Sequence, residues 1–426
     1  MIKLVIKQSG PLKGKVRISG SKNSVLPIIA ATLLTQGENI IEEVPLLNDV
    51  EIMCNLIESI GGEITRTGNS KLSISSKGIN EIVAPYELVS KLRASFLVMG
   101  PLLARVGEAK ISMPGGCAIG TRPVDLHLKG FAAMGAEINN SSGYIHATAK
   151  KLKGAQIYLD FPSVGATENI LMAACLAEGS TIIENASVEP EVVDLANFLI
   201  MAGADIKGAG TDTIKITGVD ELKATSHLVI PDRIEAGTFM VAAAITQGDI
   251  IIENVIPDHL KPVSAKLKEC GVEISEELTS IRVKADTKMK AVDIKTLPYP
   301  GFPTDMQSQI ASLMSLSEGT SVIVETIFEN RFMHVSELNR MGANIKIDGR
   351  TAVIEGKGIL NGARVKANDL RAGAALVLAG LSAEGITEVT NAEHIFRGYE
   401  NIDEKLKSLG ADVSKEEEER ADEDSE

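Results

Sequence analysis

Residues 341–356, MGANIKIDGRTAVIEG, carry a Gly-x-acid/amide-aliphatic signature and continue into strand-like alternation of apolar and polar residues. The signature occurs six times, with its glycine at positions 61, 135, 203, 271, 342 and 410, a spacing of 68 to 74 residues. Each copy follows an amphipathic pattern such as VDLANFLIMA. The glycine is therefore predicted to end a helix as its C-cap and to turn the chain into a strand. The chain contains six copies of one structural unit.

A second helix, upstream of the amphipathic one in each copy, is far more apolar. It is rich in Ala, Leu, Met and Gly and apolar around most of its circumference, which is typical of a buried helix. The six copies are NSVLPIIAATLL, RASFLVMGPLLA, ATENILMAACLA, IEAGTFMVAAAI, MQSQIASLMSLS and LRAGAALVLAGL. β-rich runs such as STIIENA and GDIIIENV follow. Each repeat is predicted to contain strand, buried helix, strand, amphipathic helix and strand.

The length of 426 residues and the six repeats predict an α/β protein of two domains. We expect three repeats in each domain, with the boundary just before VIPDRIEAG, and with buried helices inside and strands and amphipathic helices outside. A solenoid of six stacked repeats is the alternative. Solenoid repeats are usually shorter, about 20–45 residues, which disfavours it.

Composition excludes several classes of protein. No stretch approaches the roughly 20 apolar residues of a membrane span, and the amino terminus lacks a signal-peptide pattern, so we expect a cytoplasmic location. The net charge of −14 argues against general nucleic-acid binding. The last eleven residues, EEEERADEDSE, hold eight acids and one arginine and predict a disordered tail. The cysteines at 54, 117, 175 and 270 lack the spacing of metal ligands, so no metal is expected.

Cations stand at the beginnings of several buried helices. Lys22, Arg93, Arg233 and Arg371 occupy these positions. A helix N-terminus disfavours a cation, so their recurrence indicates a small, multiply charged anion bound where the helices of both domains face a shared cleft. A solvated or salt-bridged surface residue is the alternative for each one. Acidic residues suit a helix start, and Asp305 and Asp369 fit there as N-caps.

The motifs of the chain, in order, resemble one family. They are GSKNSVLPIIAATLL, PGGCAIGTRPVDLH, SVGATENI, PDRIEAGTF, PTDMQ, FENRFMHV, DLRAGAALVLAGL and HIFRGYENIDEKL. The chain resembles the UDP-N-acetylglucosamine 1-carboxyvinyltransferase family, enolpyruvyl transferases of peptidoglycan synthesis, from residue 1 to about 413.

The resemblance implies a fold and a domain organisation. The family's fold is two inside-out α/β barrels, each of three βαβαββ repeats, with the active site in the interdomain cleft. The first barrel is expected over 22–229 and carries the loop of Cys117. The second is expected over 1–21 and 230–415, because the family's amino-terminal strand returns to the second barrel. An acidic tail is expected over 416–426.

The implied reaction transfers the enolpyruvyl group of phosphoenolpyruvate to the 3′-hydroxyl of UDP-N-acetylglucosamine and releases phosphate, without a cofactor. The two anionic groups of phosphoenolpyruvate require cationic, bidentate partners. By motif match the residues that bind it are Lys22, Asn23, Arg122, Arg331, Arg371 and Arg397. The catalytic residues are Cys117, Asp305, Lys22 and Arg397.

Cys117 lies in a glycine-rich loop beside Arg122, and nearby positive charge lowers a thiol pKa. In the family the matching cysteine is the general acid, adds to C2 of phosphoenolpyruvate and is alkylated by fosfomycin. The glycines suit a lid that closes over the substrate. The alternative, an inert small hydrophobe, is the interpretation for Cys54, Cys175 and Cys270, which lie in apolar helical runs.

Asp305 is the expected base at the sugar hydroxyl, with a plain N-cap as the alternative. The resemblance assigns nucleotide-sugar binding to Asn23, Arg93, Arg122, Pro123, Val124, Asp125, Leu126, Ser163, Val164, Gly165, Asp305 and Ile327. Phe161 stands where the family often has a basic residue, which places contacts from this stretch in doubt. His127 is expected either to support the lid or to be structural.

Two rival functions remain. A sister enolpyruvyl transferase of the shikimate pathway has an Asn-Ala-Gly-Thr stretch, which this chain lacks, and has no catalytic cysteine in this loop. A catalytically silent paralogue would bind nucleotide sugar or a regulatory partner only. The intact set of motif residues disfavours the silent paralogue.

Overall fold

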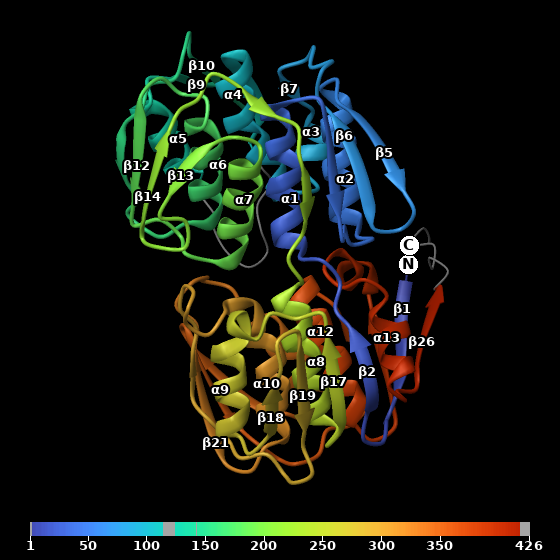
Figure 1. The fold of residues 1–426 in the computed structure, drawn as a ribbon. Coiled ribbons are helices and arrows are strands. Elements are labelled where there is room, and N and C mark those ends of the chain that lie inside the picture. The colour runs from blue at the N-terminus through green and yellow to red at the C-terminus, as the bar shows by residue number, and fades with distance from the viewer. Residues whose placement is uncertain (1, 114–123, 142, 418–426) are drawn as a thin grey trace, which may run out of the picture. The chain divides into compact units, whose positions relative to one another are not determined.

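The structure, a computed structural model, describes residues 2–113, 124–141 and 143–417 (Figure 1). These residues form two compact units. The first unit comprises the described residues between 20 and 230, and the second unit comprises residues 2–19 and 231–417. Both are built from helices and mixed sheets, so the predicted α/β class is confirmed. No helix in the described ranges combines the length and apolar character needed to cross a bilayer.

The described residues of the first unit form three four-stranded sheets and one two-stranded sheet. The sheet β16-β4-β6-β5 consists of Ser226–Leu228, Glu38–Glu42, Lys71–Ser75 and Glu63–Thr67. The sheet β7-β8-β10-β9 consists of Val83–Ala84, Glu108–Ser112, Tyr144–Thr148 and Glu137–Ser141. The sheet β11-β12-β14-β13 consists of Gln156–Tyr158, Ser180–Glu184, Thr213–Thr217 and Asp205–Lys207. The short sheet pairs β15, Leu222–Lys223, with β3, Thr35–Gln36.

The described residues of the second unit form three more four-stranded sheets. The sheet β18-β19-β17-β2 consists of Glu273–Glu276, Ser280–Lys284, Asp249–Glu253 and Lys13–Arg17. The sheet β20-β21-β23-β22 consists of Ile294–Lys295, Thr320–Val324, Thr351–Glu355 and Asn344–Asp348. The sheet β24-β25-β1-β26 consists of Arg364–Lys366, Ile386–Thr390, Ile2–Lys7 and Val413–Glu417.

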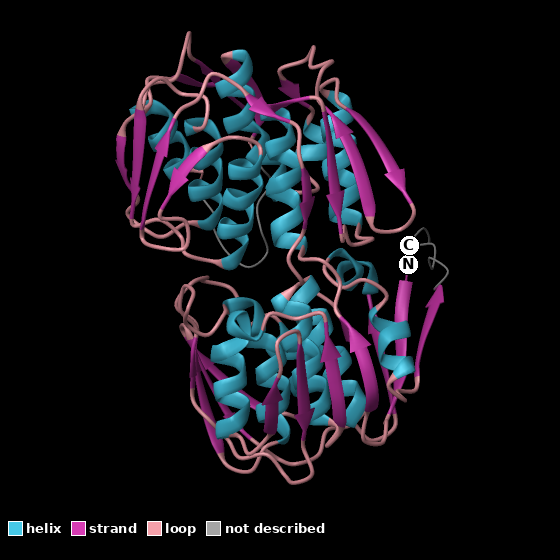
Figure 2. Cartoon of the chain, in the orientation of Figure 1, coloured by secondary structure: helices cyan, strands magenta, loops and turns pink. Residues whose placement is uncertain are grey.

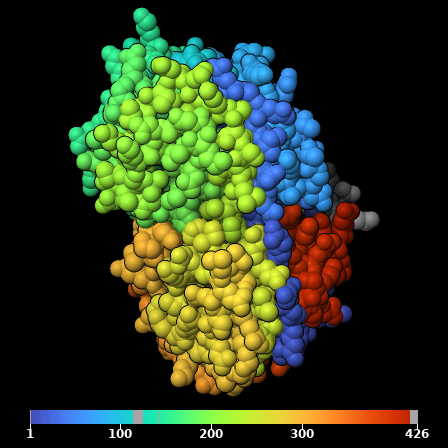
Figure 3. Space-filling model, viewed as in Figure 1, coloured from blue at the N-terminus to red at the C-terminus, as the bar shows by residue number. Residues whose placement is uncertain are grey.

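All of these four-stranded sheets share one pairing pattern, which is the structural counterpart of the sequence repeat. A short parallel strand lies beside a central strand, and two antiparallel strands complete the sheet, as in β11-β12-β14-β13. In the sheet of the sixth repeat the amino-terminal strand β1 pairs antiparallel with both β25 and β26. The first strand therefore lies in the second unit, and Figure 1 labels β1 beside β26. Figure 3 shows blue amino-terminal residues next to the red carboxy-terminal ones of the same unit.

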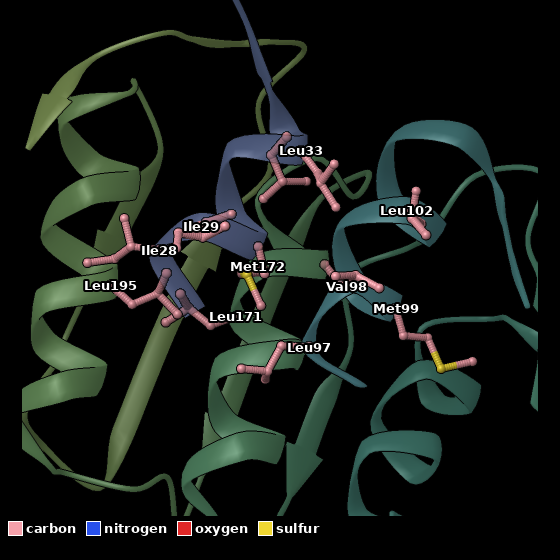
Figure 4. Packing of buried hydrophobic residues seen from close by; sticks show 14 of the residues in the cluster. Ile28, Ile29, Leu33, Leu97, Val98, Met99, Leu102, Leu171, Met172 and Leu195 are labelled. Carbon is pink, nitrogen blue, oxygen red and sulfur yellow. The ribbon is translucent and has the colours of Figure 1, made fainter. Parts of the chain in front are cut away.

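The helices of the first unit are α1 (Lys22–Ala31), α2 (Asn48–Ser59), α3 (Tyr86–Val89), α4 (Met99–Val106), α5 (Asp125–Ala133), α6 (Val164–Ala174) and α7 (Pro190–Met201), with the 3₁₀ segments η1 (Thr32–Leu34) and η2 (Arg93–Val98). The predicted buried helices form the core. Figure 4 shows side chains of α1, η2, α4, α6 and α7 packed on one another, among them Ile28, Leu97 and Leu171. Burial of each such side chain contributes about 1.5–3 kcal/mol.

The helices of the second unit are α8 (Arg233–Ile245), α9 (Lys261–Glu269), α10 (Gln307–Leu316), α11 (His334–Arg340), α12 (Leu370–Ser382) and α13 (Ile402–Ser408), with the 3₁₀ segments η3 (Pro257–Leu260), η4 (Thr304–Met306) and η5 (Ala392–Arg397). The apolar helices α8, α10 and α12 pack against one another in its core. Figure 2 shows strands lying outside the helices in each unit. The prediction of buried helices inside and strands outside is thus confirmed.

The signature glycines have left-handed backbones at each of the predicted helix ends. Their φ values are 98° at Gly61, 89° at Gly135, 110° at Gly203, 100° at Gly271, 95° at Gly342 and 97° at Gly410. Residues with a Cβ rarely adopt this region. The glycine follows the C-cap residue, for example Ile60, by one position, so the prediction that it ends the helix and turns the chain is confirmed with the glycine at C′. This explains why glycine is the invariant letter of the repeat.

The predicted tail begins too early in the sequence. Glu416 and Glu417 belong to β26, where they pair with Lys3 and Ile2 of β1. The Lys3 ammonium also lies 3.4 Å from the Glu416 carboxylate. The prediction of disorder is wrong for these two residues because a neighbouring strand supplies backbone hydrogen bonds and an opposite charge. Residues 418–426 lie outside the described ranges.

Candidate active site

In the second unit, the Asp305 carboxylate lies between two guanidinium groups. Arg331 Nη2 donates to Oδ1 over 2.8 Å, while Arg371 Nε and Nη2 donate to Oδ2 over 3.2 and 3.0 Å. The arginine side chains are buried, with 4% and 2% exposed, whereas the Asp305 side chain is 26% exposed. The Asp305 carboxylate is therefore partly exposed to solvent, and the buried guanidinium groups of Arg331 and Arg371 hold it through charge-assisted hydrogen bonds.

The start of α12 and a buried tyrosine hold Arg371 in place. Asp369 caps the helix, because its Oδ1 accepts hydrogen bonds from the backbone N–H groups of Arg371 and Ala372 over 2.7 and 2.9 Å. The guanidinium lies 5.2 Å from the ring centroid of Tyr399. Burial acts to lower the pKa of Arg371, but Tyr399 and Asp305 outweigh it and the net effect is a raised pKa. The predicted cap at Asp369 is confirmed.

Gln309 connects the backbone of Asp305 to the Tyr399 hydroxyl through hydrogen bonds. Its Nε2 donates to the Asp305 carbonyl oxygen over 2.9 Å and to the Tyr399 hydroxyl over 3.0 Å. Arg371 Nη1 is buried and has no hydrogen-bond partner within the described part of the chain. A buried charged donor without a partner is costly, so an anionic group bound beside this nitrogen would stabilise it.

The alternative of Asp305 as a plain N-cap is wrong. The N-cap residues of η4 and α10 are Pro303 and Met306, neither of which makes a side-chain cap bond. Asp305 lies in the first turn, and its carboxylate faces Arg331 and Arg371 instead. Its partners lie 26 and 66 residues further along the chain, and a local sequence pattern does not reveal them.

Three other predicted residues belong to the second unit: Arg397, Ile327 and Arg233. Arg397 ends η5, two residues before Tyr399. The backbone N–H of Ile327 donates to the buried Glu325 carboxylate over 2.8 Å. Arg233, one of the expected helix-start cations, lies 5.6 Å from the centroid of the Tyr299 ring.

In the first unit, Lys22 opens α1 and its ammonium is already paired. Lys22 Nζ lies 3.1 Å from Oδ2 of Asp49 in the first turn of α2, and the two side chains are 10% and 3% exposed. Ser21 occupies the N-cap position but makes no cap bond through its side chain. The ion pair fixes the long lysine side chain beside Asn23. Asp49 was not predicted, because nothing in the pattern of α2 distinguishes it from a solvated acidic residue.

Three segments that carry predicted nucleotide-sugar residues of the first unit meet at His127. Its Nδ1 lies 3.1 Å from Asn169 Nδ2 of α6, and its ring meets Phe96 of η2 edge-on at 5.1 Å. A Cβ placed on Gly165 would lie 3.3 Å from His127 Cε1. His127 therefore joins three segments: η2, which carries Arg93; the start of α5, with Val124, Asp125 and Leu126; and the start of α6, with Ser163, Val164 and Gly165.

The charge state of His127 gives a pH dependence of stability. Burial, with a smaller effect of the Arg93 charge, lowers its pKa to about 3 from 6.5. The unfolded chain therefore binds the proton first, and stability contributed by neutral His127 is lost as the pH falls below 6.5 towards 3. Between pH 7 and pH 5 the loss is about 2 kcal/mol. We expect His127→Asn to flatten this part of a plot of melting temperature against pH. An unchanged slope would contradict the assignment.

Three of the cysteines fit the prediction of inert thiols. Cys54, Cys175 and Cys270 are buried and free. Burial raises the pKa of each thiol to about 12. Cys117, Arg122 and Pro123 lie outside the described residues.

Phe161, which stands where the family often has a basic residue, has a side chain that is 44% exposed.

Comparison with known proteins assigns this fold to a class. A family model described as EPSP synthase (3-phosphoshikimate 1-carboxyvinyltransferase) matches residues 6–406. The solved structure of the enolpyruvyl transferase NikO from Streptomyces tendae is 25% identical with a TM-score of 0.89, covering 97% of this chain and 98% of that one. EPSP synthase from Acinetobacter baumannii, 20% identical, has a TM-score of 0.78 over 98% of this chain and 100% of its own. The fold is that of the enolpyruvyl transferases.

Relatives of higher identity narrow the assignment. UDP-N-acetylglucosamine 1-carboxyvinyltransferase 1 of Caldanaerobacter subterraneus subsp. tengcongensis is 65% identical over 411 residues, 96% of this chain and 99% of that protein. UDP-N-acetylglucosamine 1-carboxyvinyltransferase 2 of Carboxydothermus hydrogenoformans is 59% identical over 417 residues, 97% of this chain and 99% of that protein. The chain belongs to the UDP-N-acetylglucosamine 1-carboxyvinyltransferases, within the EPSP synthase family.

Proposed function

We propose that this enzyme transfers the enolpyruvyl group of phosphoenolpyruvate to the 3′-hydroxyl of UDP-N-acetylglucosamine and releases phosphate, in peptidoglycan synthesis in the cytoplasm. The single observation that carries the proposal is the cluster in which the buried side chains of Arg331 and Arg371 contact the carboxylate of Asp305. It combines a partly exposed carboxylate, which suits a hydroxyl acceptor, with two guanidinium groups, which suit a multiply anionic donor. The relatives named above support the same pair of substrates.

The proposed organisation has each unit as an inside-out α/β barrel of three βαβαββ repeats. The first spans 22–229, and the second spans 1–21 and 230–415. Central helices surrounded by strands in each unit support it. Residues of the two units are proposed to bind the same substrates: Lys22, Asn23, Arg122, Arg331, Arg371 and Arg397 bind phosphoenolpyruvate, and Asn23, Arg93, 122–126, 163–165, Asp305 and Ile327 bind the nucleotide sugar.

The proposed chemistry is addition followed by elimination. Cys117 protonates C3 of the enol, the sugar oxygen bonds to C2, and Asp305 accepts the hydroxyl proton. The resulting tetrahedral ketal loses the C3 proton and breaks the bond between C2 and the phosphate oxygen, which restores the double bond. Lys22 and the arginines stabilise the phosphate charge as it leaves.

A phosphate-release assay tests the function. We expect turnover with phosphoenolpyruvate and UDP-N-acetylglucosamine together, and none when shikimate 3-phosphate replaces the nucleotide sugar. Turnover with phosphoenolpyruvate and shikimate 3-phosphate, but not with UDP-N-acetylglucosamine, would support the sister enzyme. Absence of turnover with either acceptor would support a silent paralogue.

Cys117 provides a chemical test of the same proposal. Cys117→Ala should lower turnover by at least about 10²-fold, the usual contribution of a general acid. Fosfomycin should inactivate the native enzyme irreversibly by alkylating Cys117. Cys54, Cys175 and Cys270 are built-in controls, because burial raises the pKa of each to about 12. Peptide mass spectrometry that finds the adduct on any of these three would contradict the assignment.

A further inference from the structure

One position of the repeat is used differently in the fifth copy. The residue directly after the central strand has a left-handed backbone in four repeats, with φ of 57° at Glu43, 55° at Asn185, 59° at Asn254 and 54° at Asn391. Glu325 occupies the same position after β21 and has no positive φ. Glu325 therefore departs from the backbone conformation of these four repeats, as does Met113 after β8 of the second repeat.

The side-chain chemistry is reversed as well. Asn185 Nδ2 donates to the Leu159 carbonyl over 2.7 Å, and Asn254 Nδ2 donates to the Ile18 carbonyl over 2.8 Å. Each amide thus ties the central strand to the chain that follows its parallel neighbour, and this role is structural. In the fifth repeat, a carboxylate, which only accepts hydrogen bonds when ionised, replaces the amide donor.

Glu325 gathers four donors around a buried carboxylate. Oε1 accepts from Thr296 Oγ1 over 2.9 Å and from the backbone N–H groups of Ile327 and Phe328 over 2.8 and 3.2 Å. Oε2 accepts from Thr304 Oγ1 over 2.9 Å. Glu325 is 1% exposed, and the described residues supply no cation at ion-pair distance. Burial of a carboxylate is costly unless donors surround it, so the four hydrogen bonds are what hold Glu325 in this position.

Three of the four donors belong to the two segments that carry the acceptor residues, and the fourth, Thr296, follows β20. Thr304 precedes Asp305 in η4, and Ile327 is the predicted apolar contact of the nucleotide. The Phe328 ring centroid lies 5.6 Å from the Arg331 guanidinium, which in turn binds Asp305. The Glu325 carboxylate therefore connects the Asp305 turn to the 326–328 loop.

We propose that Glu325 is a positioning residue for the nucleotide-sugar acceptor. It holds Asp305 and Ile327 in a fixed relation, so that the sugar hydroxyl meets the carboxylate while the loop contacts the nucleotide. This role rests on the proposed function, since it requires UDP-N-acetylglucosamine as the acceptor. It sets the KM for the acceptor and leaves phosphoenolpyruvate binding to the cationic residues.

Three variants separate positioning from stability. Glu325→Ala should raise the KM for UDP-N-acetylglucosamine at least tenfold and change that for phosphoenolpyruvate less than twofold. Glu325→Gln should stay within about threefold of the native enzyme, because the amide oxygen accepts from the two backbone N–H groups and its NH₂ donates to Thr304. Asn254→Ala, at the matched position of another repeat, should lower the melting temperature without changing either KM.

Two further measurements keep the outcome decisive. If Glu325→Ala fails to fold, Thr304→Val removes one bond alone and should raise the acceptor KM three- to tenfold. Hydrogen exchange needs no turnover: Glu325→Ala should accelerate exchange in peptides covering 302–309 and 325–331 together, whereas Asn254→Ala should not. Equal rises in both KM values, or a lower melting temperature with unchanged KM and exchange, would overturn the proposal. A native enzyme inactive with UDP-N-acetylglucosamine would instead overturn the proposed function, and the exchange result would still report the coupling.

Discussion

Asp305→Asn should lower kcat by roughly 10²–10⁴-fold, the range expected for loss of a positioned general base. Asparagine preserves the shape of the side chain but cannot take the proton of the sugar hydroxyl. It also presents a neutral group to Arg331 and Arg371, which donate over 2.8 and 3.0 Å to the native carboxylate. The KM for phosphoenolpyruvate should not rise, because both guanidinium groups remain and lose a competing anion.

The matched control for Asp305 lies on the surface of the same unit. Asp249 accepts from Arg282 Nε and Nη2 over 2.8 and 2.7 Å, so its contacts resemble those between Asp305 and Arg371. Asp249→Asn should leave kcat and both KM values unchanged, because an exposed pair contributes only about 0–1 kcal/mol. A kcat for Asp305→Asn within tenfold of the native value, with melting temperature unchanged, would remove Asp305 from the role of base.

The fold was largely predictable because its signals are local and repeated. The C-cap glycines and the apolar helices specify each repeat without reference to distant residues, and six copies reinforce each interpretation. The place of β1 in the sheet with β25 and β26 was not readable from the repeat, because strand pairing over the whole length of the chain leaves no local pattern. The family resemblance supplied that detail.

Individual residues of the site were predictable from the sequence, but the contacts between them and their supporting residues were not. Arg331, Arg371 and Asp305 were predicted, and the structure joins them. The residues that support the predicted site residues were missed. Asp49 pairs with Lys22 and Tyr399 lies against Arg371, and neither contact is visible in the local sequence. Glu325 is an exception, since it stands where three other repeats have an asparagine, Asn185, Asn254 and Asn391, and this difference is visible in the sequence once the copies are aligned.

The second large effect is expected at Arg371. Arg371→Lys should lower kcat/KM for phosphoenolpyruvate by about 10²–10³-fold, which corresponds to roughly 3–4 kcal/mol. An ammonium cannot keep both contacts to Asp305 and the contact to the Tyr399 ring and still offer a further donor to the proposed substrate. The native guanidinium donates to Asp305 over 3.2 and 3.0 Å and lies 5.2 Å from the Tyr399 ring centroid, while its buried Nη1 has no hydrogen-bond partner among the described residues.

Arg282→Lys is the matched control, because Arg282 makes the same two-nitrogen contact to a carboxylate but has a side chain that is 54% exposed. Its activity should equal that of the native enzyme. Steady-state phosphate release at varied phosphoenolpyruvate measures both variants. If Arg371→Lys retains native kcat/KM, charge alone suffices at this position and planar recognition is not required. If it loses activity only together with the folded state, the guanidinium serves the core of the second unit, and the anion-binding role passes to Arg331 and Arg397.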